Sequence, residues 1–171
     1  MRRKPTPTPS AAPVPAVADD AVELQAPLEV IDGWPPIAVE SLWARRLPGA
    51  GDRYRLDSVP AFALDLAWQD EVRAHRQGGA WLIAEVVGRG GRSALRVLVD
   101  PAEDADAIAH RLAVLGAGVQ RTFIPALLTL DLAPELDAGP LLAALDAAEA
   151  DGELEWQEGW LAPAHRRPPP D

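Results

Sequence analysis

Hydrophobic and polar positions alternate with a period of two through the front half of the chain, which is typical of half-buried β-strands. The alternation predicts short strands over residues 39–47, 54–56, 61–67, 71–77 and 80–87. In the first of these, Val39, Trp43 and Leu47 share the mostly apolar side. Glu40 and Arg46 lie on the other side. Five short strands joined by tight turns predict a small, bent antiparallel sheet or partial barrel.

The stretch from Gly90 to Pro101 marks a change of architecture. Gly90 and Gly91 permit a turn with positive φ, and the residues after them alternate as a mostly buried strand that ends at Val99. Asp100 suits the N-cap of a following helix, and Pro101 suits its first position. A β-rich half therefore ends here, and a half of alternating strands and helices begins.

Apolar residues recur at helical spacing in two segments of the back half. The first covers residues 105–115, and the second is opened by Pro134 and Asp137 and ended by Gly152. Strands are predicted at residues 119–123, 127–132 and 153–157, in addition to the strand that ends at Val99. The order strand-helix-strand-strand-helix-strand predicts a ferredoxin-like βαββαβ half, so the fold class is α+β.

Proline-rich sequence at both ends predicts disordered segments. Residues 1–35 are assigned to a Pro/Ala-rich leader and residues 162–171 to a disordered tail. Residues 36–161 then form a single α+β domain, with the β-rich half at 36–90 and the ferredoxin-like half at 91–161. Prolines interrupt the leader, so it cannot form the apolar helix of a signal peptide, and the protein is expected in the cytoplasm.

The net charge of −10 is concentrated in the back half. Residues 100–160 carry thirteen Asp and Glu against Arg111 and Arg121, whereas positive and negative charges balance over residues 1–99. An acidic surface repels phosphates, so the back half is not expected to bind nucleic acid. The lack of cysteine excludes disulfides and thiolate chemistry, and no apolar run is long enough for a membrane-spanning helix.

Three acidic residues near the end of the chain, Glu153, Glu155 and Glu158, stand beside Trp156 and Trp160. One interpretation is an exposed strand face that only keeps the protein soluble. The alternative is an acidic surface bordered by tryptophan that docks a basic protein partner, because aromatic residues surrounded by charge are typical of binding hot spots.

A second candidate site is a polar pocket between the two halves, formed by Arg55, Asp57, Arg92, Ser93 and Arg96. Asp57 follows a strand and precedes Val-Pro, so a turn stabilised by its own carboxylate is the simpler interpretation of that residue.

The sequence contains no recognisable catalytic set. His75, His110 and His165 lack the spacing of metal ligands, and the histidine at position 165 falls in the predicted tail. No Ser-His-Asp triad can be assembled from the sequence, and neither a metal ion nor a cofactor is expected.

Four phrases, VESLWAR, GDRYRLDSVPAFALDLAWQDEV, GRGGRSALRVLV and DGELEWQEGW, together resemble the bacterial domain-of-unknown-function family 4265. The resemblance covers residues 34–160, and its most specific part is YRLDSVP with the DEV turn that follows. The chain departs from the family pattern at Gln69, where glycine is usual, and at Arg92 and Ala94, where His and Thr are usual. The resemblance implies a fold and a bacterial origin, while the family itself has no known activity.

The leading hypothesis is a noncatalytic protein-binding module that uses its acidic face on a basic partner, for example an immunity protein that neutralises a bacterial toxin. A regulator that binds RNA or a nucleotide through the arginines of the front half is the alternative. An enzyme that uses Asp57, Arg92 and Ser93 is the third hypothesis.

Overall fold

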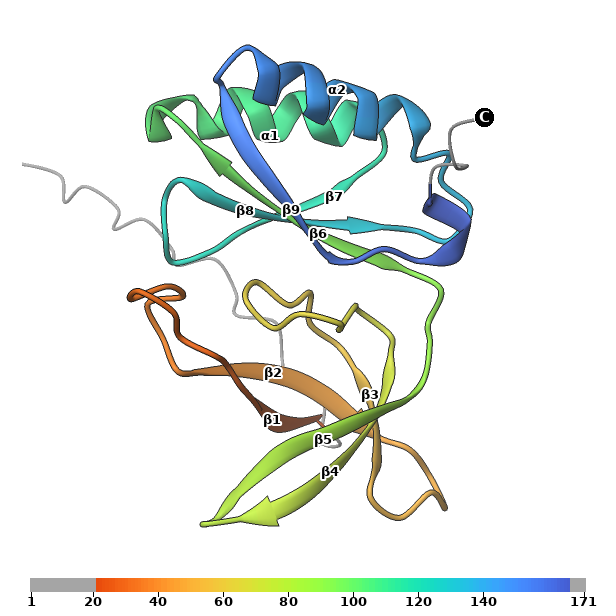
Figure 1. Ribbon diagram of the computed structural model, residues 1–171. Helices are drawn as coiled ribbons and strands as arrows, with labels where there is room; N and C mark the ends of the chain where they lie inside the picture. The colour runs from red at the N-terminus through yellow and green to blue at the C-terminus, as the bar shows by residue number, and fades with distance from the viewer. Residues whose placement is uncertain (1–20, 167–171) are drawn as a thin grey trace, which may run out of the picture.

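The computed structural model describes residues 21–166. They form two β-sheets that lie one above the other (Figure 1). The lower sheet closes into a barrel, and the upper sheet carries two helices on the face turned away from the barrel (Figure 1). The protein therefore has the predicted mixed α+β class. No helix within residues 21–166 is long and apolar enough to cross a membrane.

The barrel consists of five short strands. They are β1 (Ala21–Pro27), β2 (Val39–Arg46), β3 (Arg53–Leu56), β4 (Glu71–Gln77) and β5 (Ala80–Gly88). Consecutive strands pair antiparallel, and β1 meets β5 in parallel at Gln25 and Leu82, which closes the barrel. Closure leaves the sheet without a free edge. The barrel core is apolar and includes Leu24, Leu42, Tyr54, Leu56 and Val72.

The first strand corrects the predicted boundary of the leader. The sequence assigns residues 1–35 to a disordered segment, but Ala21–Pro27 form β1. The proline-rich composition masks a short alternating stretch in which Leu24 and Ala26 turn into the barrel and are buried. Residues 1–20 lie outside the described residues.

The side chains of β2 point the opposite way from the prediction. Glu40, Leu42 and Ala44 are buried, whereas Val39 and Trp43 are 42% and 46% exposed. A shift by one residue exchanges the two faces of a strand. The prediction placed the side of Trp43 inside, because the other side carries the charged Glu40. Glu40 can be buried because backbone N–H groups donate hydrogen bonds to its carboxylate, as described below.

Residues 57–70, between β3 and β4, form an irregular loop in place of the strand predicted at 61–67. We name residues 57–70 the junction loop, because they lie between the barrel and the upper sheet. Asp65 and Gln69 have φ values of 60° and 68°, which strand residues do not adopt. Glycine, which the resemblance leads one to expect at position 69, adopts such a φ without strain.

The upper sheet follows the predicted order of strands and helices. Its elements are β6 (Ser93–Val99), α1 (Ala105–Val114), β7 (Gly118–Arg121), β8 (Leu127–Leu132), α2 (Gly139–Ala150) and β9 (Leu154–Trp160). The strands lie in the order β7-β8-β6-β9, and all pairs are antiparallel. Both helices cover one face, where a second core includes Leu95, Val97, Leu112, Leu130, Leu141 and Leu145. The opposite face is turned toward the barrel (Figure 1).

The start of α1 differs from the prediction. A short 3-10 helix, η1 (Ala102–Asp104), comes between β6 and α1, and neither element has a side-chain cap. Asp100 therefore does not cap the helix.

The predicted tail at 162–171 is also corrected, because Pro163–His165 form a 3-10 helix, η2, and His165 is buried. Its Nδ1 lies 2.6 Å from Ser93 Oγ and its Nε2 lies 3.0 Å from the carbonyl oxygen of Ala133. The tautomer that donates from Nε2 and accepts from the serine hydroxyl satisfies both contacts. Residues 167–171 lie outside the described residues.

A substitution at Gly90, in the connection between the sheets, tests how tightly the junction loop is packed. A Cβ at position 90 would lie 2.8 Å from the backbone carbon and oxygen of Gln69. We expect Gly90→Ala to lower the free energy of unfolding by about 2 kcal/mol, because a backbone atom cannot move aside as a flexible side chain can. Gly88→Ala is the matched control, since its Cβ would meet only the side chain of Glu71, at 3.3 Å. Urea denaturation of both variants checks this, and equal losses would contradict it.

Candidate functional site

The carboxylate of Glu40 holds the junction loop from the barrel side. It is 7% exposed and accepts hydrogen bonds from the backbone N–H groups of Ala61, Phe62 and Ala63, at 2.6, 3.0 and 2.7 Å. A buried carboxylate is tolerated only when donors replace its lost hydration, and three amides in succession do so here. The loop backbone is therefore fixed by a side chain and not by a β-ladder.

Arg96 of β6 holds the same loop from the side of the upper sheet. Its Nη1 donates to the carbonyl oxygen of Phe62 at 3.1 Å, and its Nε donates to Gln157 Oε1 at 3.0 Å. Burial lowers the pKa of Arg96, and the nearby carboxylate of Glu40 acts in the opposite direction. Among residues 21–166, no carboxylate forms an ion pair with Arg96.

Two hollows flank Arg96. The first, which we name the junction cleft, has a volume of about 570 Å³ and lies between the barrel, the junction loop and β9. Its lining is mainly apolar and includes Ile31, Trp34, Leu64, Leu66, Ile83 and Val86. Trp34 also packs edge-on against Phe62, with ring centres 5.9 Å apart. This volume lies in the range of small-molecule sites.

The second hollow, which we name the acidic groove, has a volume of about 750 Å³ and lies where β6 ends and β9 begins. Carboxylates line it at Asp100, Glu149 and Glu155. The groove also has apolar lining, at Trp34, Leu98, Leu127, Leu154 and Trp156. Trp34, Arg96 and Gln157 line both hollows, so the two are neighbours across these side chains.

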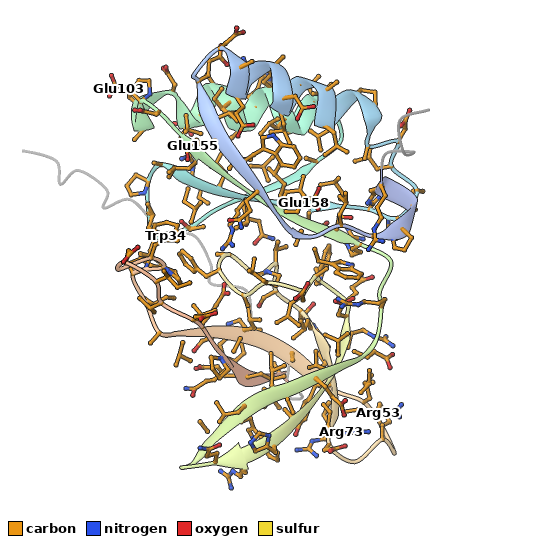
Figure 2. The ribbon with its side chains drawn as sticks, viewed as in Figure 1. Trp34, Arg53, Arg73, Glu103, Glu155 and Glu158 are labelled. Carbon is orange, nitrogen blue, oxygen red and sulfur yellow. The ribbon has the colours of Figure 1, made fainter. Side chains whose placement is uncertain are left out.

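The five residues predicted to bind a partner do not form one surface. Glu155 lies in the acidic groove, whereas Glu158 lies nearer the other end of β9 (Figure 2) and lines a separate hollow with Trp160. Glu153 is paired with Arg111, 2.6 Å away. Trp156 packs partly against the helix-side core and lines both the acidic groove and the separate hollow of Glu158.

The predicted polar pocket is divided among separate contacts. Arg55 pairs with Glu71 at 2.7 Å, on the outside of the barrel, and Asp57 pairs with Arg45 at 2.9 Å. Arg92 forms a two-pronged ion pair with Asp131. This contact is the main cause that raises the pKa of Arg92. The fifth member, Arg96, lies between the two hollows as described above.

Ser93, the remaining member of the predicted pocket, is fully buried in the contact with His165. Its Oγ also accepts the N–H of Ala162 at 2.8 Å, so the hydroxyl ties the end of the chain to β6. Sequence reasoning missed this pair, because a histidine 72 positions away in a proline-rich tail gives no local signal. It also missed Glu40, for which the only available signal is a carboxylate on the same side of the strand as Leu42 and Ala44.

The chain is similar to a protein family and to a solved structure. The family model described as a domain of unknown function, DUF4265, matches residues 40–156, which confirms the predicted resemblance. The solved structure is described as a novel crystal structure of a hypothetical protein from Neisseria gonorrhoeae. It has a TM-score of 0.66 and 19% identity, over 82% of this chain and 95% of that chain, which shows a shared fold alone. No curated protein matches the chain.

The contacts of Glu40 predict a large loss of stability for Glu40→Gln, which keeps the shape of the side chain but removes its charge. The amide has a single acceptor oxygen and would point an N–H₂ group at backbone donors. We expect the free energy of unfolding to fall by about 3 kcal/mol, because charged acceptors are replaced and donors are left unpaired. Glu29→Gln, at an exposed position, is the control and should change it by less than about 0.5 kcal/mol. Similar values for the two variants, measured by urea denaturation, would contradict the role of Glu40.

Proposed function

The chain belongs to the DUF4265 family of domains of unknown function, and since that description assigns no activity, we propose a function from the geometry. The protein is a noncatalytic binding module that holds a basic segment of a partner protein in the acidic groove. The observation that carries this proposal is a groove in which three carboxylates lie beside large apolar side chains.

The charge of the groove supports a basic partner. Asp100, Glu149 and Glu155 are exposed, and none of them forms an ion pair within residues 21–166. Further exposed carboxylates stand nearby, in η1 and just after α2. They are Glu103, Asp104 and Asp151. Clustered charge of one sign raises the association rate of an oppositely charged partner.

The apolar lining supports a protein over a free cation. Trp34 and Leu98 are 43% and 37% exposed although both are large and apolar. Trp34 and Glu155 lie on the same side of the molecule (Figure 2). Exposed aromatic and aliphatic residues beside charges are typical of interfaces in which a few anchors supply most of the binding energy. The groove thus fits a segment that carries Lys or Arg next to a large apolar residue.

An immunity protein that neutralises a basic bacterial toxin is the concrete form of this proposal, and we propose that it acts in the cytoplasm. We also propose that the upper sheet and its helices are a ferredoxin-like unit. The order β7-β8-β6-β9, with α1 and α2 on one face, supports that classification.

The competing hypotheses receive less support. Of the nine arginines from Arg45 to Arg96, five form ion pairs with carboxylates, which reduces the charge that is free to meet phosphates. The paired arginines are Arg45, Arg55, Arg73, Arg89 and Arg92. For an enzyme, Ser93 would have to act from a fully buried position.

Charge reversal in the groove tests the proposal. The tagged protein, the variant Glu149→Lys/Glu155→Lys and the control Glu135→Lys serve as baits in lysate of the native cell. Glu135 is an exposed acid near the start of α2, whereas Glu149 lies near its end. We expect the wild type and the control to retain a protein that the double variant loses, because reversal turns attraction into repulsion.

The retained protein is then purified, and its binding is measured by calorimetry at two salt concentrations. We expect a 1:1 complex whose affinity falls about tenfold between 0.05 and 0.3 M salt, because exposed charges are screened. A complex that is indifferent to salt and to the double variant would contradict binding in the groove, as would three baits that retain the same proteins.

A further inference from the structure

The junction cleft is not used by the proposed partner contact, and it places one cation against apolar walls. Two nitrogens of Arg96 donate to neutral acceptors, the carbonyl oxygen of Phe62 and Oε1 of Gln157. Its third nitrogen, Nη2, has no hydrogen-bond partner among residues 21–166, and it is not among their buried unpaired atoms. Both N–H groups of Nη2 are therefore left without an acceptor among these residues.

The charge of Arg96 is poorly compensated for its surroundings. Glu40, the acid whose charge acts on Arg96, already accepts three backbone hydrogen bonds. Desolvation of a cation without an ion-pair partner is unfavourable, and the lowered pKa of Arg96 reflects it. An anion that enters the cleft would offset this cost.

The apolar walls of the cleft favour a ligand whose remaining part is apolar. Ile31 and Leu64 at the cleft are 61% and 50% exposed, which is unusual for aliphatic side chains of this size, and Ile83 and Val86 are half-buried beside them. A ligand with an apolar body would remove these surfaces from water, which favours its binding.

We propose that the junction cleft binds a small monocarboxylic acid with an apolar body, whose carboxylate accepts a hydrogen bond from Arg96 Nη2 and whose body lies against Leu64 and Ile83. This inference concerns a different hollow from the acidic groove and does not depend on a protein partner.

Acids at the cleft do not oppose this assignment. Glu85 is paired with Arg73, and the side chains of Glu29 and Asp65 are exposed to solvent, where charge is screened. The half-buried guanidinium acts in a less polar environment, where its attraction for a carboxylate is stronger.

Three probes with the same chain length and different head groups test the proposal: octanoate, 1-octanol and octylamine. Calorimetry on the full chain measures each affinity, and the Nε–H resonance of Arg96 in ¹⁵N-labelled protein reports where the head group lies. We expect octanoate to bind about tenfold more tightly than octanol, as one charge-assisted hydrogen bond provides, and to shift the Arg96 resonance. Octylamine should bind more weakly than either.

Two variants locate the site. Leu64→Glu leaves the contacts of Arg96 intact but adds a negative charge at the cleft, and it should weaken octanoate binding about tenfold. Val114→Glu on α1, where the residue is 73% exposed, is the matched control and should bind as the wild type does. Arg96→Met should remove the preference for octanoate over octanol, and its far-ultraviolet circular dichroism shows whether it is folded.

Equal affinities for octanoate and octanol, tighter binding of octylamine, or no binding of octanoate would each overturn the proposal. So would an equal effect of the two glutamate substitutions. The Leu64→Glu variant separates the two hollows, because Leu64 lines the junction cleft and not the acidic groove.

Discussion

The junction loop is held by hydrogen bonds from both sheets, and the geometry of the region between the sheets depends on these bonds. Glu40 of the barrel accepts three backbone N–H groups of the loop, and Arg96 of the upper sheet donates to the carbonyl oxygen of Phe62. A second contact between loop and sheet, from the Asp65 N–H to the carbonyl oxygen of Gly159, measures 2.8 Å. Phe62, Leu64 and Leu66 of the loop line the junction cleft, so the shape of that cleft depends on this constraint.

The elements with a clear period could be predicted from the sequence. The helical spacing of Ile108 and Leu112 and the two-residue alternation of Leu95 and Val97 each point to a core on one side, and those residues are buried. The prediction failed where a tertiary contact replaced local pairing. The junction loop has the alternation of a strand, yet its amides bond to a carboxylate from β2.

The candidate site could be predicted less well, because its parts are distant in sequence. The acidic groove joins Trp34, from a segment that reads as a leader, to Leu98 and to Glu155. Of these, only Glu155 belongs to a pattern that sequence reasoning singles out. Burial of Glu40 and His165 runs against the usual exposure of such residues, and only their partners in space explain it. Charge concentration, in contrast, is a property of composition, and it indicated the acidic half without any structure.

Amide hydrogen exchange at the junction loop tests most directly whether the hydrogen bonds of Glu40 and Arg96 hold the loop. If the Glu40 carboxylate holds the amides of Ala61, Phe62 and Ala63, these hydrogens exchange as slowly as those of the barrel strands, although no β-ladder covers them. Exchange as fast as that of the exposed turn at Gly78 would contradict the account, because a loop that is not held would not keep the junction cleft in place.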